Sequence, residues 1–301
     1  MRSTLIKAVP VAALLAVVLL SCGERRKAEP FTPTFSTYTP SEAEAEIAPE
    51  RREVFYGLLT PVEITYIFER LNIPYEREVL NPTGNVDNYM TSAKAALNLG
   101  VYGVNLGYLK IFNRNQDMVR YLFAVRTLAD RLNVPEEYLL APVREIERDM
   151  ADADSVMAIM NRSFENIESH LRQYGRESTA GLMIMGGYIE ALYLATNLAL
   201  DPENPDPAVV QRIAEQKYTL NTLLTFMRNY YDDPMVVFYT KKLLYLKRYF
   251  DTFNIYYKAD DLEIDTSRQV IVASGSDMTI TLETLFNIRN YLARLRQEII
   301  E

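Results

Sequence analysis

Residues 178–200, STAGLMIMGGYIEALYLATNLAL, form the stretch around which the rest of the chain must fold. It carries three glycines and one charged side chain, Glu190. At about 1.5 Å of rise per residue, a helix of this length could cross a bilayer. A charge at its centre is expensive in lipid, and charged residues flank it closely at Arg176, Glu177 and Asp201. We therefore predict a helix enclosed on all sides by other helices.

A second apolar stretch, residues 92–112, also carries three glycines: Gly100, Gly103 and Gly107. Glycine lowers helix propensity by about 1 kcal/mol relative to alanine, but it lets another backbone approach closely. An amphipathic segment follows each apolar one, at 117–133 and 207–231. The pattern is consistent with a duplicated helical hairpin, and equally with two buried helices that resemble each other by chance.

Apolar side chains recur every three or four residues in most other segments, as in amphipathic helices. These stripes lie at 118–132, 157–174, 210–227, 239–257 and 285–299. Gly175 predicts the end of the helix with the 157–174 stripe, and Asp206 with Pro207 predicts the start of the helix over 207–231. The pattern changes near Asp260, where alternating and β-branched residues over about 262–281 predict a small β-hairpin, with Thr279–Thr281 extending a strand. The predicted fold is mainly α: a multi-helix antiparallel bundle with a small β-hairpin before the C-terminal helix.

The N-terminus has the features of an export signal. Arg2 and Lys7 precede an apolar run at 9–20, and Leu19-Leu20-Ser21-Cys22 follows. This pattern resembles the lipobox of bacterial lipoproteins. The resemblance implies cleavage before Cys22, which would then carry a diacylglycerol thioether and an amide-linked acyl chain such as palmitate. An ordinary signal peptide or a transmembrane anchor with an incidental cysteine is the alternative.

These features divide the chain into a signal peptide (1–21), a flexible tether (22–49) and a helical domain (50–301). The tether is rich in proline, serine and threonine and cannot bury enough apolar surface to fold alone. Cys22 is the only cysteine, so no intramolecular disulfide can form. Gly23 follows it, whereas an aspartate there would favour the inner membrane in proteobacterial lipoproteins. We expect an outer-membrane anchor with the domain facing the periplasm.

The charge balance is acidic, with a formal net charge of −8 at pH 7. An acidic chain disfavours nucleic acid as a partner. The net charge also gives no reason to expect binding to anionic lipid surfaces. The predicted partners are the bilayer, reached through acylated Cys22, and an envelope protein or a small ligand.

Residues for metal or nucleophilic chemistry are scarce. The single histidine, His170, has Ile167 three positions before it, so the Glu-x-x-His pairs of di-iron bundles are absent, and zinc hydrolase ligands cannot be assembled. We expect His170 to lie at the surface or rim. No phosphate-binding glycine loop or nucleophile elbow is present. We predict no metal, no cofactor and no enzymatic activity, although 40 acidic residues leave a carboxylate-only enzyme open.

The best candidate site consists of polar side chains that share one face on each apolar helix. They are Glu190, Tyr193 and Asn197 on the central helix, and Asn98, Tyr102 and Asn105 on the other. If the faces meet, a carboxylate, amides and phenols come together inside the bundle, where buried polar groups must be paired. Such a cluster could hold a small polar or cationic ligand, or it could be a hydrogen-bond network between helices.

The region from Glu177-Ser-Thr-Ala-Gly181 onward, with a strand pair and a C-terminal helix, resembles uncharacterised helical lipoproteins of the Bacteroidota. The resemblance implies a lineage and no activity. The leading hypothesis is a membrane-anchored envelope lipoprotein with a structural or protein-interaction role. The alternative is a periplasmic helical bundle that binds a small ligand through the polar groups of the two apolar helices.

Overall fold

The computed structural model describes residues 68, 71–135, 137–138, 153–201, 203–257, 262–265, 270–273 and 276–301. All of these residues belong to one compact unit within Pro49–Glu301. The predicted signal peptide, Cys22 and the tether lie outside the described residues.

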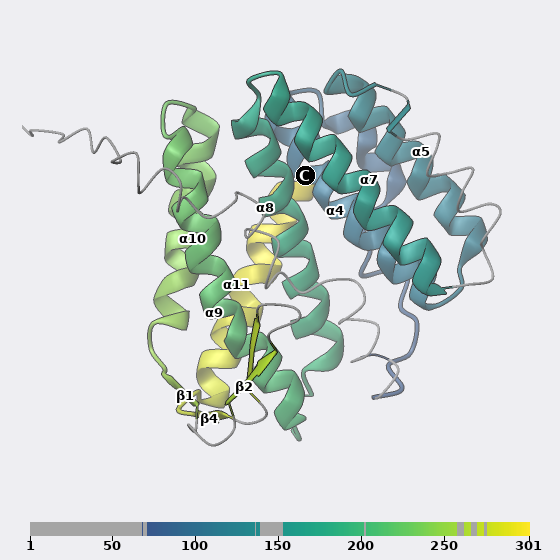
Figure 1. Ribbon diagram of the computed structural model, residues 1–301. Coiled ribbons are helices and arrows are strands. Elements are labelled where there is room, and N and C mark those ends of the chain that lie inside the picture. The colour runs from purple at the N-terminus through teal and green to yellow at the C-terminus, as the bar shows by residue number, and fades with distance from the viewer. Residues whose placement is uncertain are drawn as a thin grey trace, which may run out of the picture. The chain divides into compact units, whose positions relative to one another are not determined.

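The described part of the chain is mainly α-helical, which confirms the predicted fold class (Figure 1). Its longer helices are α4 (Ser92–Ile111), α5 (Asn115–Arg131), α7 (Ala153–Gln173), α8 (Glu177–Leu194), α9 (Pro207–Met227), α10 (Pro234–Phe250) and α11 (Leu282–Ile300). Two 3-10 helices, η2 (Thr83–Asn88) and η4 (Arg228–Tyr230), and a π-helical turn, η3 (Ala195–Ala199), complete the helical segments.

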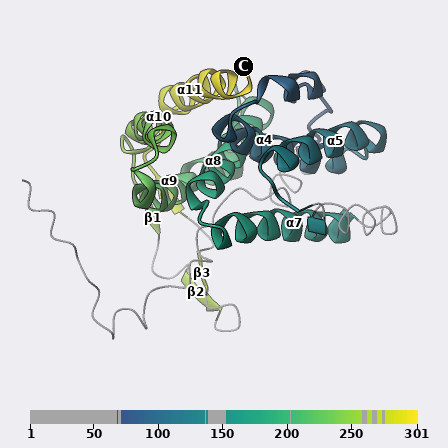
Figure 2. The same cartoon turned by 90° about the horizontal axis from the view of Figure 1, so that it is seen from above.

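The two apolar helices, α4 and α8, pack directly on each other at the centre of the unit (Figure 2). Glycines make this approach possible. A Cβ atom at Gly186 would collide with the backbone of Leu97, and one at Gly100 would collide with the backbone of Met183. The close approach expected from the glycines is therefore present, and it joins the two segments most strongly predicted to be buried.

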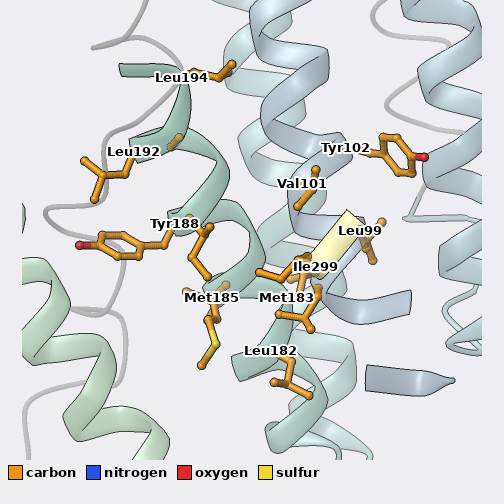
Figure 3. Close-up of a cluster of buried hydrophobic side chains, with 14 of the residues drawn as sticks. Leu99, Val101, Tyr102, Leu182, Met183, Met185, Tyr188, Leu192, Leu194 and Ile299 are labelled. Carbon is orange, nitrogen blue, oxygen red and sulfur yellow. The ribbon is translucent and has the colours of Figure 1, made fainter. Parts of the chain in front are cut away.

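Apolar side chains from three helices fill the space around this contact (Figure 3). Leu99 and Val101 come from α4, Met185 and Leu192 from α8, and Ile299 from α11, and none of them is more than 1% exposed. At about 25 cal/mol per Å² of apolar surface removed from water, such side chains each contribute about 1.5–3 kcal/mol. The core thus forms where α4, α8 and the end of α11 meet.

The other helices pack around this centre. α5 packs on α4, α9 on α8, and α10 lies between α9 and α11. Thr252 lies beside Thr284, whereas Lys242, ten residues earlier, pairs with Glu298, so α10 and α11 run in opposite directions. Each apolar helix therefore contacts the amphipathic helix that follows it, an arrangement consistent with the duplication hypothesis.

Several helix ends follow from local chemistry in the sequence. Asp206 accepts hydrogen bonds from the main-chain N–H groups of Ala208 and Val209, and Pro207 occupies the first helical position of α9, as predicted. Gly175 ends α7 with φ of 67°, in the left-handed region that glycine adopts without penalty. These signals confirm the predicted start of α9 and the predicted end of α7.

The central segment is not one uniform α-helix as predicted. α8 ends at Leu194, and the chain continues as the π turn η3 before Leu200 leaves the helix. Within that turn Thr196 Oγ1 donates to the carbonyl of Leu192 at 2.8 Å, and Asn197 Nδ2 donates to the carbonyl of Tyr193 at 2.9 Å. Such side-chain bonds to the preceding turn compete with regular helical pairing, which apolar periodicity alone does not reveal.

The predicted helical stripe over 239–257 was too long. α10 ends at Phe250, and Tyr257 belongs to strand β1 (Ile255–Tyr257), which pairs antiparallel with β4 (Ser276–Met278). Phe253 stays buried against Phe250, with ring centroids 6.0 Å apart, although it lies beyond the helix. The apolar spacing therefore continued past the end of the helix because buried side chains continued there.

The hairpin region agrees with the prediction in its main feature. β2 (Leu262–Asp265) pairs antiparallel with β3 (Val270–Ala273). Thr281, however, does not extend a strand, because its hydroxyl accepts a hydrogen bond from the N–H of Thr284 and caps α11. Threonine is a good N-cap, and here that local preference decides its role.

Candidate functional site

The polar faces of the two apolar helices meet through one direct contact. Asn105 Nδ2 on α4 donates a hydrogen bond of 2.6 Å to Glu190 Oε1 on α8. Both side chains are completely buried, with 0% of their surface exposed. The predicted meeting of a carboxylate and an amide between the helices is therefore present.

A cation from a third helix completes the pairing of the carboxylate. Arg296 on α11 donates from Nε to Glu190 Oε2 at 2.9 Å and from Nη2 to Glu190 Oε1 at 3.1 Å. Nη2 also donates to the carbonyl of Val79 at 2.8 Å, and the guanidinium lies 4.6 Å from the centroid of the Tyr193 ring. This two-pronged geometry is the strongest way to pair an arginine with a carboxylate.

Burial disfavours the charged form of Arg296, and the neighbouring carboxylate of Glu190 favours it. Desolvation alone would lower the pKa of the guanidinium, but the charge and hydrogen bonds of Glu190 outweigh that effect and hold the pKa above its usual value. A buried ion pair is tolerable only when both partners are present and their remaining hydrogen-bonding groups are satisfied. Asn105 and the Val79 carbonyl supply those further partners.

Asn81, in the segment before η2, connects Asn105 through hydrogen bonds to the residues that contact the end of α11. Its main-chain N–H donates to Asn105 Oδ1 at 3.0 Å, and its side-chain amide donates to Asn98 Oδ1 at 3.1 Å and to the Tyr89 hydroxyl at 3.0 Å. Asn98 Nδ2 donates in turn to the carbonyl of Ile299 at 2.9 Å. The cluster is thus one continuous chain of hydrogen bonds from Glu190 to the last turn of α11.

The last carbonyls of α11 receive their hydrogen bonds from this cluster. Tyr89 Oη donates to the carbonyl of Ile300 at 2.8 Å, and Asn85 Nδ2 approaches the same oxygen at 3.3 Å. Helix ends leave four carbonyls without partners inside the helix, and a buried end needs partners from elsewhere. We call the set Asn81, Asn85, Tyr89, Asn98, Asn105, Glu190 and Arg296 the buried network.

The remaining predicted residues lie at the edge of this network. The Tyr102 hydroxyl donates to the carbonyl of Pro82 at 2.9 Å, and burial raises the pKa of Tyr102 well above its usual value. Tyr193 contributes its ring beneath Arg296, and Asn197 accepts a bond of 3.2 Å from Arg289 on α11. All six predicted residues therefore bind or contact other parts of the chain, and three of them, Asn98, Asn105 and Glu190, belong to the network itself.

Sequence reasoning missed four members of the network: Arg296, Asn81, Asn85 and Tyr89. A signal for Arg296 existed, because it lies four residues after Leu292 and three before Ile299, next to the apolar stripe of α11. A cation in that position is a natural partner for a lone buried carboxylate. The two asparagines lie on either side of Pro82-Thr83-Gly84, and nothing in their spacing indicated contact with α4.

The network is closed by partners within the chain. Of the buried side-chain nitrogen and oxygen atoms that lack a hydrogen bond in the described part of the protein, none belongs to the network. No group of three or more histidine, cysteine, aspartate or glutamate side chains is placed to hold a metal among the described residues. His170 is half-buried, and its ring contacts the rings of Tyr138 and Tyr174.

Among the described residues, one helical segment, Glu177–Ala199, is long and apolar enough to cross a membrane, and 78% of its apolar window is buried inside the protein. That burial agrees with the prediction of an enclosed core helix. Comparison of the chain with protein-family models, with curated proteins and with solved structures gives no match.

Proposed function

We propose that the protein is an envelope lipoprotein, held in the outer membrane by acylated Cys22, whose periplasmic helical domain has a structural or protein-interaction role. The observation that carries this proposal is the complete pairing of Glu190 by Arg296 and Asn105. The polar groups best placed to bind a ligand are used to hold the fold together. The functional contacts are therefore expected on the surface of the domain.

The same geometry weakens the alternative of a small-ligand site at Glu190. A ligand that replaced Arg296 on the carboxylate would leave a buried guanidinium without its partner. Breaking one side of a buried ion pair typically costs about 3–5 kcal/mol. A ligand at this position would have to offset that cost as well as the loss of the bond to the Val79 carbonyl.

The anchoring part of the proposal is tested by labelling cells with an alkyne-tagged fatty acid. Cells express the full chain or its Cys22→Ala variant, and cell fractions are compared. We expect label and salt-resistant membrane association in the wild type and loss of the label in Cys22→Ala. An unlabelled wild-type chain would contradict lipid anchoring, and so would equal labelling of both chains.

The interaction part is tested by chemical cross-linking in the same intact cells, followed by native mass spectrometry of the wild-type chain released from the membrane. The proposal predicts a discrete cross-linked protein adduct, and a released chain with the mass of the mature polypeptide and its acyl groups and no other bound small molecule. A small molecule that stays bound to the wild type would favour the ligand-binding alternative. Absence of any adduct would contradict the interaction role.

A further inference from the structure

Helix α10 carries a second stripe of side chains on the side opposite its core contacts. Pro234, Phe238, Lys241, Tyr245 and Arg248 follow one another at spacings of four and three, so they share one face of the helix. All five are exposed, with 45% of Phe238 and 47% of Tyr245 accessible to solvent. We call these five residues the outer face of α10.

The outer face is basic although the chain as a whole is acidic. Four lysines and arginines lie between Pro234 and Phe250, and no aspartate or glutamate does. The chain as a whole has a formal net charge of −8. That net charge gives no reason to expect binding to anionic lipid, whereas the local charge of this helix is positive.

The Tyr245 ring of the outer face is held between neighbouring side chains. The Tyr245 ring stacks on Tyr291 of α11, with centroids 5.4 Å apart and an interplanar angle of 25°. The Tyr291 hydroxyl donates to the carbonyl of Lys242 at 2.9 Å. The guanidinium of Arg248 lies 5.0 Å from the centroid of the Tyr245 ring. Because this ring is already ordered, binding a surface costs little side-chain entropy.

Two of the four cations of α10 form ion pairs with acidic side chains, and the other two lie on the outer face. Lys242 pairs with Glu298 at 2.8 Å, and Lys247 pairs with Asp251 within the same helix. Lys241 and Arg248 are exposed and lie on the outer face itself. These two charges, separated by two helical turns, are available to an external anion.

We propose that the outer face of α10 docks on an anionic phospholipid surface. Tyrosine favours the headgroup region of a bilayer, and phenylalanine inserts at the boundary between headgroups and acyl chains. Lysine and arginine extend their charged ends to the lipid phosphates while their stems remain in apolar surroundings. A helix whose outward face carries both kinds of side chain can lie along the membrane surface, with its rings at the headgroups and its cations beside the anionic lipids. The face spans 15 residues, or about 21 Å along the helix axis.

The pattern fits a bilayer better than an acidic protein. A protein partner presents its carboxylates at fixed positions and usually receives buried aromatic anchors in matching pockets. On α10 the cations and rings alternate along a single helix, which suits a surface whose negative charges are mobile. Docking would place the domain against the membrane and does not depend on acylation of Cys22.

The test measures binding of the full chain to vesicles of phosphatidylcholine alone and to vesicles with about three parts in ten phosphatidylglycerol. The test variant is Lys241→Glu/Arg248→Glu. The matched control is Arg77→Glu/Arg120→Glu, which makes the same change in net charge at two exposed arginines beside Asp117. Any contribution of the apolar N-terminal segment is the same in all three proteins.

Each basic residue near an anionic leaflet contributes about fivefold to binding. Loss of two cations and repulsion by two new carboxylates should therefore lower the preference for phosphatidylglycerol by at least about 30-fold in the test variant, while the control keeps it. Thermal unfolding checks that both variants are folded, which is expected because the altered side chains are exposed. Two results would overturn the proposal. A wild type without any preference would show that the face does not bind anionic lipid, and equal loss in both variants would show an effect of net charge.

Discussion

The carboxylate of Glu190 and the guanidinium of Arg296 meet in a two-pronged ion pair inside the protein, although the residues are 106 positions apart in the chain. Glu190 is fully buried, and the side chain of Arg296 is 6% exposed. The pair connects α11 to α8. Asn98 binds the end of α11 to α4, and Tyr89 binds it to the segment around η2. The final helix is thereby an integral part of the core.

Replacing Arg296 with methionine is expected to lower the free energy of unfolding by about 3–5 kcal/mol, because Glu190 would be left buried without its cation. Arg296→Lys should recover only part of that loss, since an ammonium cannot form the parallel pair of hydrogen bonds. Urea unfolding of the three proteins measures the effect. Equal stability of all three would show that the pair is not a structural element.

The contact between α4 and α8 predicts opposite effects for two adjacent glycines. Gly186→Ala places a methyl group against the backbone of Leu97, which cannot move without displacing α4, so we expect a loss of about 3 kcal/mol or more. At Gly187 the nearest atom, the carbonyl oxygen of Gly100, would lie at 3.6 Å, an ordinary contact. Gly187→Ala should therefore raise stability by up to about 1 kcal/mol through helix propensity.

Circular dichroism during thermal unfolding distinguishes these two variants. Gly186→Ala should unfold at a much lower temperature than Gly187→Ala. Similar melting temperatures for the two variants would mean that the helices do not approach as closely as the structure places them.

Asn98→Ala is expected to lower the free energy of unfolding by about 1–3 kcal/mol, since it leaves the Ile299 carbonyl and part of Asn81 without partners. The matched control is Asn197→Ala, whose side chain is half-buried and bonds outside the network. Hydrogen exchange of the last turn of α11 provides the specific readout. Faster exchange there in Asn98→Ala, and not in the control, is the expected result; unchanged exchange would disprove the capping role of Asn98.

The stability of the fold should decrease in alkaline solution because buried tyrosines resist ionisation. Burial raises the pKa of Tyr108 from 10.0 to about 12, while its hydrogen bond with the Glu76 backbone acts in the opposite direction. The folded state therefore holds its phenol proton more tightly than the unfolded state. Stability is unaffected below pH 10 and falls as the pH rises from there toward 12, by at most about 1.4 kcal/mol per pH unit for one tyrosine.

Urea unfolding across this pH range, with tyrosinate absorbance recorded in parallel, checks the tyrosine prediction. Tyr108→Phe has no phenol to ionise, so its stability should fall less steeply with pH than that of the wild type. Identical slopes in the two proteins would show that Tyr108 ionises normally in the folded state.

The sequence predicted the helical class because apolar periodicity, capping residues and glycine placement all act locally. Gly175, Asp206 and Pro207 define helix ends through short-range chemistry, and the structure confirms them. The π turn after Leu194 and the early end of α10 were missed because apolar periodicity reports burial, and burial continued where regular helical pairing did not.

The site was predicted in part. A lone carboxylate on an apolar helix indicated that a partner must exist, and Asn105 was placed correctly on the opposing helix. Arg296 and Asn81 were not foreseen, because their contacts depend on how distant segments return to the core. Spacing along one helix shows which residues share a face, whereas it does not show which distant segment covers that face.

A double-mutant cycle on Glu190 and Arg296 tests the central claim most directly, namely that the buried network holds the fold together. The free energy of unfolding is measured for the full chain, for Glu190→Met, for Arg296→Met and for both changes combined. We predict that each single change costs about 3–5 kcal/mol and that the double variant is more stable than either single variant, because no charge is left buried alone. Additive losses, with the double variant the least stable, would contradict the account.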